Sequence, residues 1–247
     1  RTCPPRNQRP IKRIFKGIER KAVMYTSLFL DLDNTLLDFN ESAKEAIRIV
    51  MADKELVYTP EVFDTFLRIN NALWQKIELG QLTKQELFAV RWNTIFKELG
   101  IGYDGPEFET CFRNKLSSCA VPVPYAKEAL EYLSGKYTVH AASNAMFRQQ
   151  MQRLKIAGMT EYFDKFFFSE ELGFFKPSKG FFDACFAELS GVQPGEVMMI
   201  GDSVSADING GAEYGLKTCW LNRRGQSTGG VKADYIISSL SEIKEIL

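Results

Sequence analysis

The hydrophobic positions of this chain follow two different periods. Residues 28–30 form an apolar run that stops at polar residues and is too short to cross a membrane, which predicts a buried strand over 27–30. From about Asp38 to Val121 the apolar residues recur at helical spacing, and from Tyr125 onward short apolar runs alternate with helical patterns. This alternation predicts a Rossmann-like parallel sheet with helices on both faces. The strand at 27–30 must belong to that sheet, because nothing near it in sequence could bury it.

The helical stretch carries signals for helix starts and ends. Thr59-Pro60 is a cap and first-turn pair ahead of one helix, and residues 83–86 form a capping box ahead of a second, which Gly100 is placed to end. Weaker helices are expected over 41–53 and 107–117. The prolines at 122 and 124 then mark a boundary. We expect an α-helical bundle over 38–121, inserted into one α/β domain made of 24–37 and 122–247.

The second part of the chain predicts regular α/β alternation. Its apolar runs and helical patterns are assigned as follows: strands at 137–142, 165–168, 197–200, 218–221 and 235–237, and helices at 126–133, 147–156, 179–189 and 206–214.

Charge is unevenly distributed along the 247 residues, although the formal net charge is zero. Residues 1–23 hold eight Lys/Arg and one Glu; subtracting these from the 31 basic and 31 acidic residues leaves 23 and 30, a net charge of −7. An acidic body argues against binding a nucleic-acid polymer. Segment 1–23 lacks the apolar core of a signal peptide, so we expect a disordered basic N-terminal extension, with a targeting or contact arm as the alternative and Met24 as a candidate natural start.

Cysteine usage points to a reducing compartment. The five cysteines are odd in number, widely spaced and without a C-x-x-C pair, which favours free thiols over a disulfide framework or a zinc site. We therefore expect a cytoplasmic protein with no membrane segment.

Two acids end the first predicted strand. Asp31 and Asp33 are two positions apart, so in an extended chain both carboxylates face the same side, at the carboxyl edge where open α/β sheets place their ligands. Such close carboxylates repel, and a divalent cation or a shared proton relieves the repulsion. The alternative is an ordinary strand-end turn, where Asp and Asn are common.

Three further polar clusters converge on the same edge. Ser143 and Asn144 follow one strand and precede a helix, where a hydroxyl and backbone N–H groups can hold a phosphate or simply cap the helix. Lys176 enters from a turn and could hold a phosphate oxygen, although most lysines are only solvated. Asp202 and Asp207 lie about one helical turn apart behind another strand. Carboxylates gathered in this way describe an oxygen-ligand site for Mg²⁺.

The four motifs together resemble the haloacid dehalogenase superfamily. They are Asp-Leu-Asp-Asn-Thr at 31–35, Ser143-Asn144, Lys176-Pro177, and Gly-Asp-Ser at 201–203 with Asp207 five residues after Asp202. The resemblance covers 26–247, and the helical insert matches the helical cap of that superfamily. Segments 207–215 and 218–222 further resemble the bacterial pyrimidine 5′-nucleotidase branch, which acts on noncanonical nucleotides.

This resemblance implies a role for each acid. Asp31 would be the nucleophile that forms an aspartyl-phosphate, and Asp33 the acid and base that protonates the leaving alcohol and activates water. Mg²⁺ would be held by Asp31, the backbone carbonyl of Asp33 and Asp202. Asp207 would either bind the metal through water or steady Lys176.

The remaining motif residues imply the substrate. Ser143, the Asn144 N–H and Lys176 would hold the phosphoryl oxygens, which indicates a Mg²⁺-dependent phosphomonoester hydrolase for a small molecule, preferably a nucleoside 5′-monophosphate. Dehalogenases of the superfamily lack the second acid, which this chain has in Asp33. A sugar-phosphate phosphatase or phosphomutase is the alternative within the class, and a non-catalytic binding or regulatory protein is the alternative outside it.

Other polar and aromatic residues are interpreted as structural. His140 lies within a predicted strand, and Arg91 and Asn70 are expected on a solvated helix face rather than against a substrate. The aromatic residues expected in the core of the bundle are Phe63, Trp74, Phe88 and Trp92.

Overall fold

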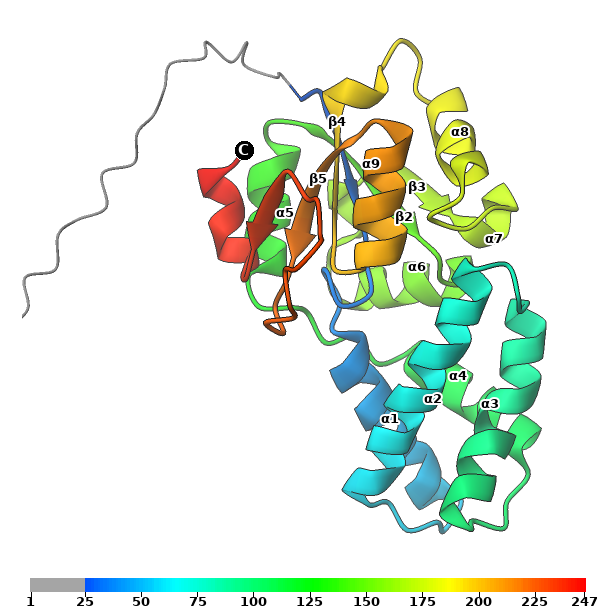
Figure 1. Ribbon diagram of the computed structural model, residues 1–247. Helices are drawn as coiled ribbons and strands as arrows, with labels where there is room; N and C mark the ends of the chain where they lie inside the picture. Colours follow the sequence, from blue (N-terminus) through cyan, green and yellow to red (C-terminus); the bar gives the residue numbers. More distant parts are fainter. Residues whose placement is uncertain (1–24) are drawn as a thin grey trace, which may run out of the picture.

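The computed structural model describes residues 25–247, so the basic segment 1–23 and Met24 lie outside the described residues. The described chain has two parts, a sheet flanked by helices and a group of four helices at one end of that sheet (Figure 1). Within residues 25–247, no helix is long and apolar enough to cross a membrane.

The sheet has six parallel strands in the order β3-β2-β1-β4-β5-β6. All six predicted strands are present: β1 (Ser27–Leu30), β2 (Thr138–Ser143), β3 (Lys165–Phe168), β4 (Val197–Gly201), β5 (Lys217–Leu221) and β6 (Tyr235–Ile237). Each of the two strands beside β1 includes one more polar or small residue at its carboxyl end than predicted, Ser143 in β2 and Gly201 in β4. The predicted α/β class is confirmed.

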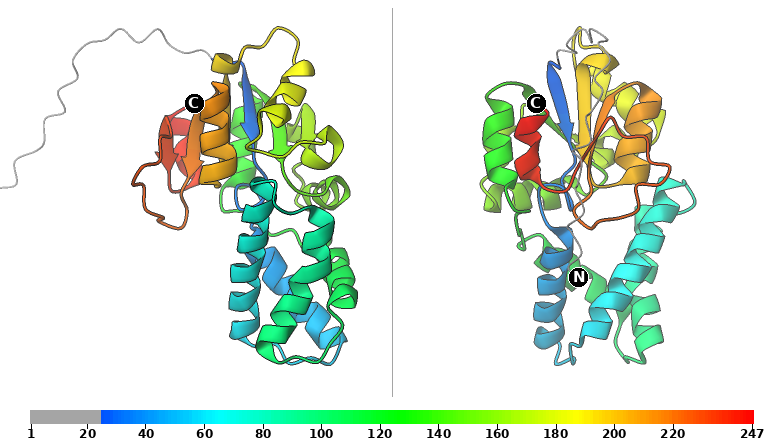
Figure 2. Two further views of the ribbon diagram at one scale, coloured as in Figure 1. Left: turned by 45° about the vertical axis from the view of Figure 1, so that its right-hand side comes forward. Right: turned by 60° about the vertical axis from the view of Figure 1, so that its left-hand side comes forward.

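Both faces of the sheet are covered. One face packs against α5 (Ala126–Ser134), α6 (Phe147–Ile156) and η4 (Leu240–Glu245), and the other against α8 (Lys179–Ala187) and α9 (Gly210–Tyr214), as the edge-on view in Figure 2 shows. Strand β1 alternates accordingly, because Leu28 and Leu30 enter the first apolar cluster and Phe29 enters the second. Burial of β1 on both faces explains its continuous apolar run.

The four inserted helices are α1 (Phe39–Asp53), α2 (Pro60–Glu78), α3 (Lys84–Leu99) and α4 (Gly105–Leu116), and we refer to them as the cap. The capping box of Thr83 and Glu86 forms as predicted, and Gly100 ends α3 in the left-handed conformation with φ 65°. Trp92 lies at the centre of the cap core, and Phe63 packs against it. Trp74 and Phe88 are only half-buried and lie outside that cluster, so their assignment to the core was wrong.

The chain leaves and re-enters the sheet domain through two adjacent linkers. Leu37 and Pro122 form an antiparallel bridge, and the Asp38 N–H donates to the Val121 carbonyl over 2.7 Å. Ser42 Oγ accepts from the Val121 N–H over 3.1 Å. Both passages between cap and core therefore run side by side, at the end of the sheet to which β1 points (Figure 1).

Several short elements were not predicted. They are α7 (Ser169–Leu172), the 3₁₀ turns η1 (Thr160–Tyr162) and η2 (Pro194–Glu196), and η4. The helix predicted over 206–214 is two segments, the π-helical η3 (Val204–Asn209) followed by α9. The π-helical turn forms because the Ser203 carbonyl accepts from the N–H groups of both Asp207 and Ile208, at 3.0 and 3.2 Å.

Arg91 and Asn70 do not lie on a solvated face; each is only 3% exposed, inside the cap. The Arg91 guanidinium pairs with both carboxylate oxygens of Glu109 at 3.0 and 2.6 Å and donates to Asn70 over 2.7 Å. Polar character alone suggested solvent, but the neighbouring helices supply partners that satisfy the charge.

His140 is buried in β2, as its structural interpretation requires, and burial lowers its pKa to about 4. Four of the five cysteines lie in the described part of the chain, and all four are free thiols: Cys111, Cys119, Cys185 and Cys219.

Candidate active site

The carboxyl end of β1 places Asp31 at the edge of the sheet. Its N–H donates to the Ile200 carbonyl of β4 over 2.9 Å, which extends the ladder by one residue and fixes the backbone. The buried Thr35 donates its hydroxyl to Asp31 Oδ2 over 3.1 Å. Asn34 has a φ of 63°, a conformation that Asn tolerates, so the chain turns sharply after Asp33 and brings Thr35 back to Asp31.

Lys176 is the cation of the site, and it is not solvated. Its side chain is 1% exposed, and the ammonium donates to Asp31 Oδ1 over 2.9 Å, Asp207 Oδ1 over 2.6 Å and the Ala142 carbonyl over 2.6 Å. All three ammonium protons therefore have partners. The steadying role considered for Asp207 corresponds to its contact with Lys176 in the structure.

Two features hold the Lys176 segment against the sheet. The Asn144 side chain pairs with the Lys176 backbone, accepting from its N–H over 2.8 Å and donating to its carbonyl over 2.9 Å. Gly210 provides the space, because a Cβ at that position would lie 2.6 Å from the Pro177 ring. The sequence suggested only a phosphate-binding or helix-capping role for Asn144, and its clamp on Lys176 was missed.

Asp202 and Asp207 approach Asp31 from the end of β4. One carboxylate oxygen from each of the three acids lies within 4.8 Å of the others. Asp207 Oδ2 also accepts from the Ser203 N–H over 3.0 Å, and a Cβ on Gly201 would lie 2.1 Å from that oxygen. Glycine at 201 is therefore what allows the Asp207 carboxylate to fold back over the strand end.

The electrostatics of this cluster fit a divalent cation. Burial raises the pKa of Asp31 to about 7, against the opposing effect of the Lys176 ammonium, and desolvation together with the carboxylates of Asp31 and Asp207 raises the pKa of Asp202 well above its usual range. Burial alone would lower the pKa of the Lys176 ammonium, but the carboxylates of Asp207 and Asp31 outweigh this effect, so the pKa of Lys176 is raised. One ammonium does not balance three carboxylates, so the donor set suits Mg²⁺, which prefers carboxylate oxygens.

Asp33 lies beside the cluster and has a separate set of partners. Arg153 Nη1 donates to Asp33 Oδ1 and Gln150 Nε2 to Asp33 Oδ2, both over 2.5 Å. Sequence reasoning missed both α6 residues. The available signal was that these polar residues lie with Leu154 on one helix face, at the i, i+3, i+4 spacing of a buried stripe.

The Ser143 segment lies at the end of β2. Ser143 Oγ accepts from the Ala145 N–H over 3.2 Å. Helix α6 begins only at Phe147, whose N–H donates to Glu170 over 2.8 Å. The first N–H of this helix is therefore engaged by a carboxylate, so the predicted phosphate-binding residues lie in the turn before the helix, which contains Ser143 and Asn144.

At the end of the cap nearest the sheet, two side chains that were not identified from the sequence contact the sheet domain. Glu78, at the end of α2, accepts from Ser205 Oγ over 2.6 Å. Lys84, at the start of α3, donates to Ser169 Oγ over 3.1 Å and lies 4.9 Å from the centre of the Phe175 ring. Burial lowers the pKa of Lys84 to about 8, although Glu170 opposes this shift. The cap thus contacts the sheet domain through one acidic and one basic side chain.

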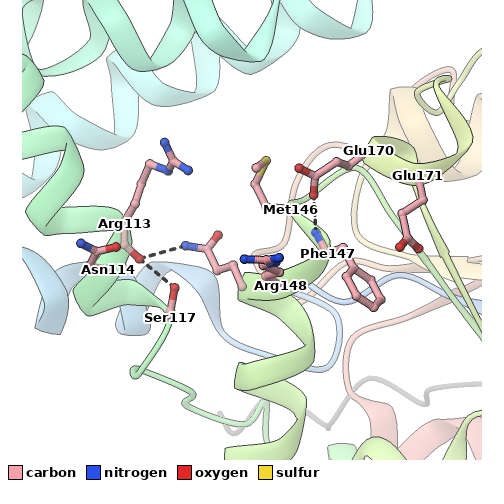
Figure 3. Close-up of a pocket in the computed structure, with 9 residues that line it drawn as sticks. Arg113, Asn114, Ser117, Met146, Phe147, Arg148, Glu170 and Glu171 are labelled. Atoms are coloured by element: carbon pink, nitrogen blue, oxygen red, sulfur yellow. Dashed lines mark hydrogen bonds between the residues drawn. The ribbon is translucent and has the colours of Figure 1, made fainter.

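A groove of about 430 Å³ lies between α4 of the cap and the start of α6. Figure 3 shows Arg113 and Ser117 on the cap side, facing Met146 and Phe147, with Glu170 beyond them. None of the predicted site residues lines it, although Met146 follows Asn144 by two positions. The groove is therefore distinct from the carboxylate cluster.

A parallel α/β sheet with an inserted helical cap, and acids gathered at the carboxyl edge, define a class of capped α/β hydrolase. The chain belongs to the haloacid dehalogenase-like hydrolases, whose family model matches residues 25–215.

The relatives of this chain include bacterial hydrolases. HAD-hydrolase YfnB of Bacillus subtilis is 31% identical over 198 residues, which cover 80% of this chain and 84% of YfnB. Pyrimidine 5′-nucleotidase PynA of Streptococcus pneumoniae is 31% identical over 201 residues, covering 81% of this chain and 85% of PynA. The crystal structure of magnesium-bound YfnB, which reveals interdomain movement, has a TM-score of 0.86 at 30% identity and covers 91% of this chain and 99% of that chain.

Proposed function

We propose that the protein is a Mg²⁺-dependent phosphatase that hydrolyses nucleoside 5′-monophosphates through a phosphoaspartate at Asp31. The observation that carries the proposal is the gathering of Asp31, Asp202 and Asp207, two of which pair with the buried Lys176, with Asp33 beside them. Asp31 has one oxygen against Lys176 and the other against Thr35, so its carboxylate is held in one orientation for attack on phosphorus.

The residues present fit Mg²⁺, with Asp31, Asp202 and the Asp33 backbone carbonyl as ligands and Asp207 as the acid that steadies Lys176. When bound, the ion would neutralise phosphate charge and favour the approach of an anionic ester to an acidic site. Ser143 and the Asn144 N–H hold the phosphoryl oxygens as charge develops on them, and the Lys176 ammonium, whose three protons already have partners, supplies positive charge beside them. Removing one such donor typically lowers the rate by about 10² to 10³.

Asp33 acts as the general acid and then as the general base. Its protonated carboxyl group donates a proton to the oxygen that leaves when Asp31 attacks, and the resulting carboxylate then accepts a proton from the water that hydrolyses the phosphoaspartate. The oxygen that leaves an ester of an alcohol is strongly basic, which is why a second acid is needed for this substrate class. The cap, residues 38–121, closes over the leaving group and excludes bulk water.

The nucleotide preference rests on the relatives. PynA and the Escherichia coli protein YjjG, 28% identical over 221 residues, are both pyrimidine 5′-nucleotidases. Their likeness to this chain spans most of each protein, 85% of PynA and 96% of YjjG. We therefore assign a pyrimidine nucleoside 5′-monophosphate as the preferred substrate class.

Phosphate release from p-nitrophenyl phosphate with Mg²⁺ tests the hydrolase proposal. Asp31→Asn is expected to lower the rate by roughly 10⁴-fold or more, because the nucleophile is lost. Asp53→Asn, an exposed acid at the end of α1, is the matched control and is expected to leave the rate unchanged. Absence of release by the wild type with any divalent ion, or equal rates for wild type and Asp31→Asn, would refute the proposal.

The substrate class is tested separately with a panel of nucleoside monophosphates and sugar phosphates. The expected result is a higher kcat/KM for pyrimidine 5′-monophosphates than for hexose or pentose phosphates. A clear preference for a sugar phosphate would replace the nucleotidase assignment while leaving the phosphatase assignment in place.

A further inference from the structure

We propose that Arg153 and Gln150 are positioning residues that hold the Asp33 carboxyl group in place for proton transfer to the leaving group. The inference rests on the proposed function, because it concerns the acid of that reaction. It assigns a catalytic consequence to two side chains that, within the described residues, form no side-chain hydrogen bond to Asp31, Asp202, Asp207 or Lys176.

The two residues form a closed network beneath Asp33. Arg153 Nη1 and Gln150 Nε2 each donate to a different oxygen of the carboxylate, so its plane is fixed as well as its position. Arg153 Nη1 also donates to Gln150 Oε1 over 2.9 Å, which fixes the orientation of the amide that faces Asp33. Both α6 residues are buried. They cannot change rotamer without disturbing the packing around them.

The opposite side of Asp33 remains accessible. The Asp33 side chain is 27% exposed, whereas that of Arg153 is 1% exposed. Each carboxylate oxygen has a second lone-pair site beyond the one that the network occupies. The network therefore restrains the carboxyl group on the side that faces Arg153 and Gln150. The solvent-exposed side of the carboxyl group stays free to exchange a proton with a substrate.

Stability alone does not explain a buried arginine at this position. A buried ion pair is often no more stabilising than well-packed apolar residues of similar volume, because both charges lose their hydration. Asp33 is the only acid with which Arg153 forms a salt bridge in the described chain. The neighbouring Leu154 shows that this helix face accepts apolar side chains. The charge is thus paired with one partly exposed carboxylate rather than with a group inside the core.

The network also reaches the cap. Arg153 Nε donates to the Cys119 carbonyl over 3.0 Å. Cys119 lies in the segment that returns from α4 to the bridge at Pro122. The Arg153 guanidinium therefore binds both Asp33 and the linker that joins α4 to the sheet domain. This contact fixes the orientation of Asp33 relative to that linker.

Two phosphate esters of similar size separate positioning of the acid from general damage. p-Nitrophenyl phosphate releases a weakly basic aryl oxide that needs no proton, whereas benzyl phosphate releases an alkoxide that does. Values of kcat/KM report steps up to leaving-group departure.

Arg153→Met should lower kcat/KM for benzyl phosphate by about 10- to 100-fold, which is part of the rate enhancement that general acid catalysis provides. It should change the value for p-nitrophenyl phosphate less than about threefold. Arg153→Lys, which keeps the charge, should recover part of the loss.

Lys155→Met, an exposed change on the same helix, is the matched control and should leave both values unchanged. If Arg153→Met does not fold, Gln150→Met decides the question by the same ratio. An equal loss with both esters, or no loss with either, would overturn the inference. The proposed function fails in a distinguishable way, since the wild type would then release phosphate from neither ester.

Discussion

The Lys176 ammonium lies 2.6 Å from Asp207 Oδ1, and both side chains are 1% exposed. This pair, with Asp31 as the second acid, is the most deeply buried ion cluster at the edge of the sheet. Removing the cation leaves two buried carboxylates without a counter-charge.

Lys176→Met should therefore lower the free energy of unfolding by about 3–5 kcal/mol in metal-free buffer, as measured by urea denaturation. It should also abolish phosphate release. Lys179→Met removes an exposed lysine three positions away and should have a much smaller effect. Equal stabilities of the two variants would contradict the buried role of Lys176.

Gly201→Ala tests the close approach of Asp207. The new Cβ would lie 2.1 Å from Asp207 Oδ2, so the carboxylate must move away from Lys176 and the Ser203 N–H. We expect a loss of about 1–3 kcal/mol in stability and a loss of activity well beyond it. Gly195→Ala, where no atom lies within 4 Å, is the control and should be nearly neutral. Full activity in Gly201→Ala would mean that the position of Asp207 is not required.

Metal binding is measurable without turnover. At a free Mg²⁺ concentration about 100 times Kd, linkage stabilises the folded protein by about 2.7 kcal/mol, which raises the Tm in a calorimetric scan. Asp202→Asn should lose most of this Mg²⁺-dependent shift, while the exposed Glu213→Gln should keep it. A shift in Asp202→Asn as large as that of the wild type would place the ion elsewhere.

The buried network of the cap predicts a non-additive pair of changes. Arg91→Met alone should destabilise the protein by about 3–5 kcal/mol, because Glu109 loses its only salt-bridge partner in the described chain. Adding Glu109→Met should restore much of that loss, since both charges are then gone. Arg68→Met removes an exposed pair with Glu98 and should change stability by less than about 1 kcal/mol. Additive losses in the double variant would show that the pair is not coupled.

Lys84 predicts a pH dependence of stability. Because burial lowers its pKa from 10.5 to about 8, the unfolded chain binds the proton more tightly than the folded chain between these two values. Stability of the wild type relative to Lys84→Met should therefore rise with pH from about 8 to 10.5, and stay level below that window. Urea denaturation at several pH values measures this difference. Lys97→Met, exposed on the same helix, should show no such slope.

The sheet, and the gathering of acids at its edge, could be predicted from the sequence for a common reason. Residues that follow parallel strands all lie at one edge, so Asp31, Asp202 and Ser143 could be placed together from strand positions alone. Lys176 was harder, because its burial depends on the Asn144 clamp and on the space at Gly210, which no periodicity reveals.

The burial of two arginines could not be predicted from the sequence, for a different reason. Arg153 and Arg91 are charged residues on helices, and the helical pattern assigns such residues to solvent unless their partners are known. The partner of Arg153 is 120 positions away in Asp33, and that of Arg91 is 18 positions away on another helix, in Glu109. Only the packing of the two elements decides whether such a charge is solvated or paired.

The bridge between Leu37 and Pro122 makes the sheet domain continuous in space although its sequence is interrupted. Both ends of the interruption are neighbours, so a short turn could join them without moving β1 or α5. The cap is therefore an exchangeable module: a helical insert of another length or sequence can enter at the same point, and the carboxylate cluster would keep its strands, its lysine and its glycines.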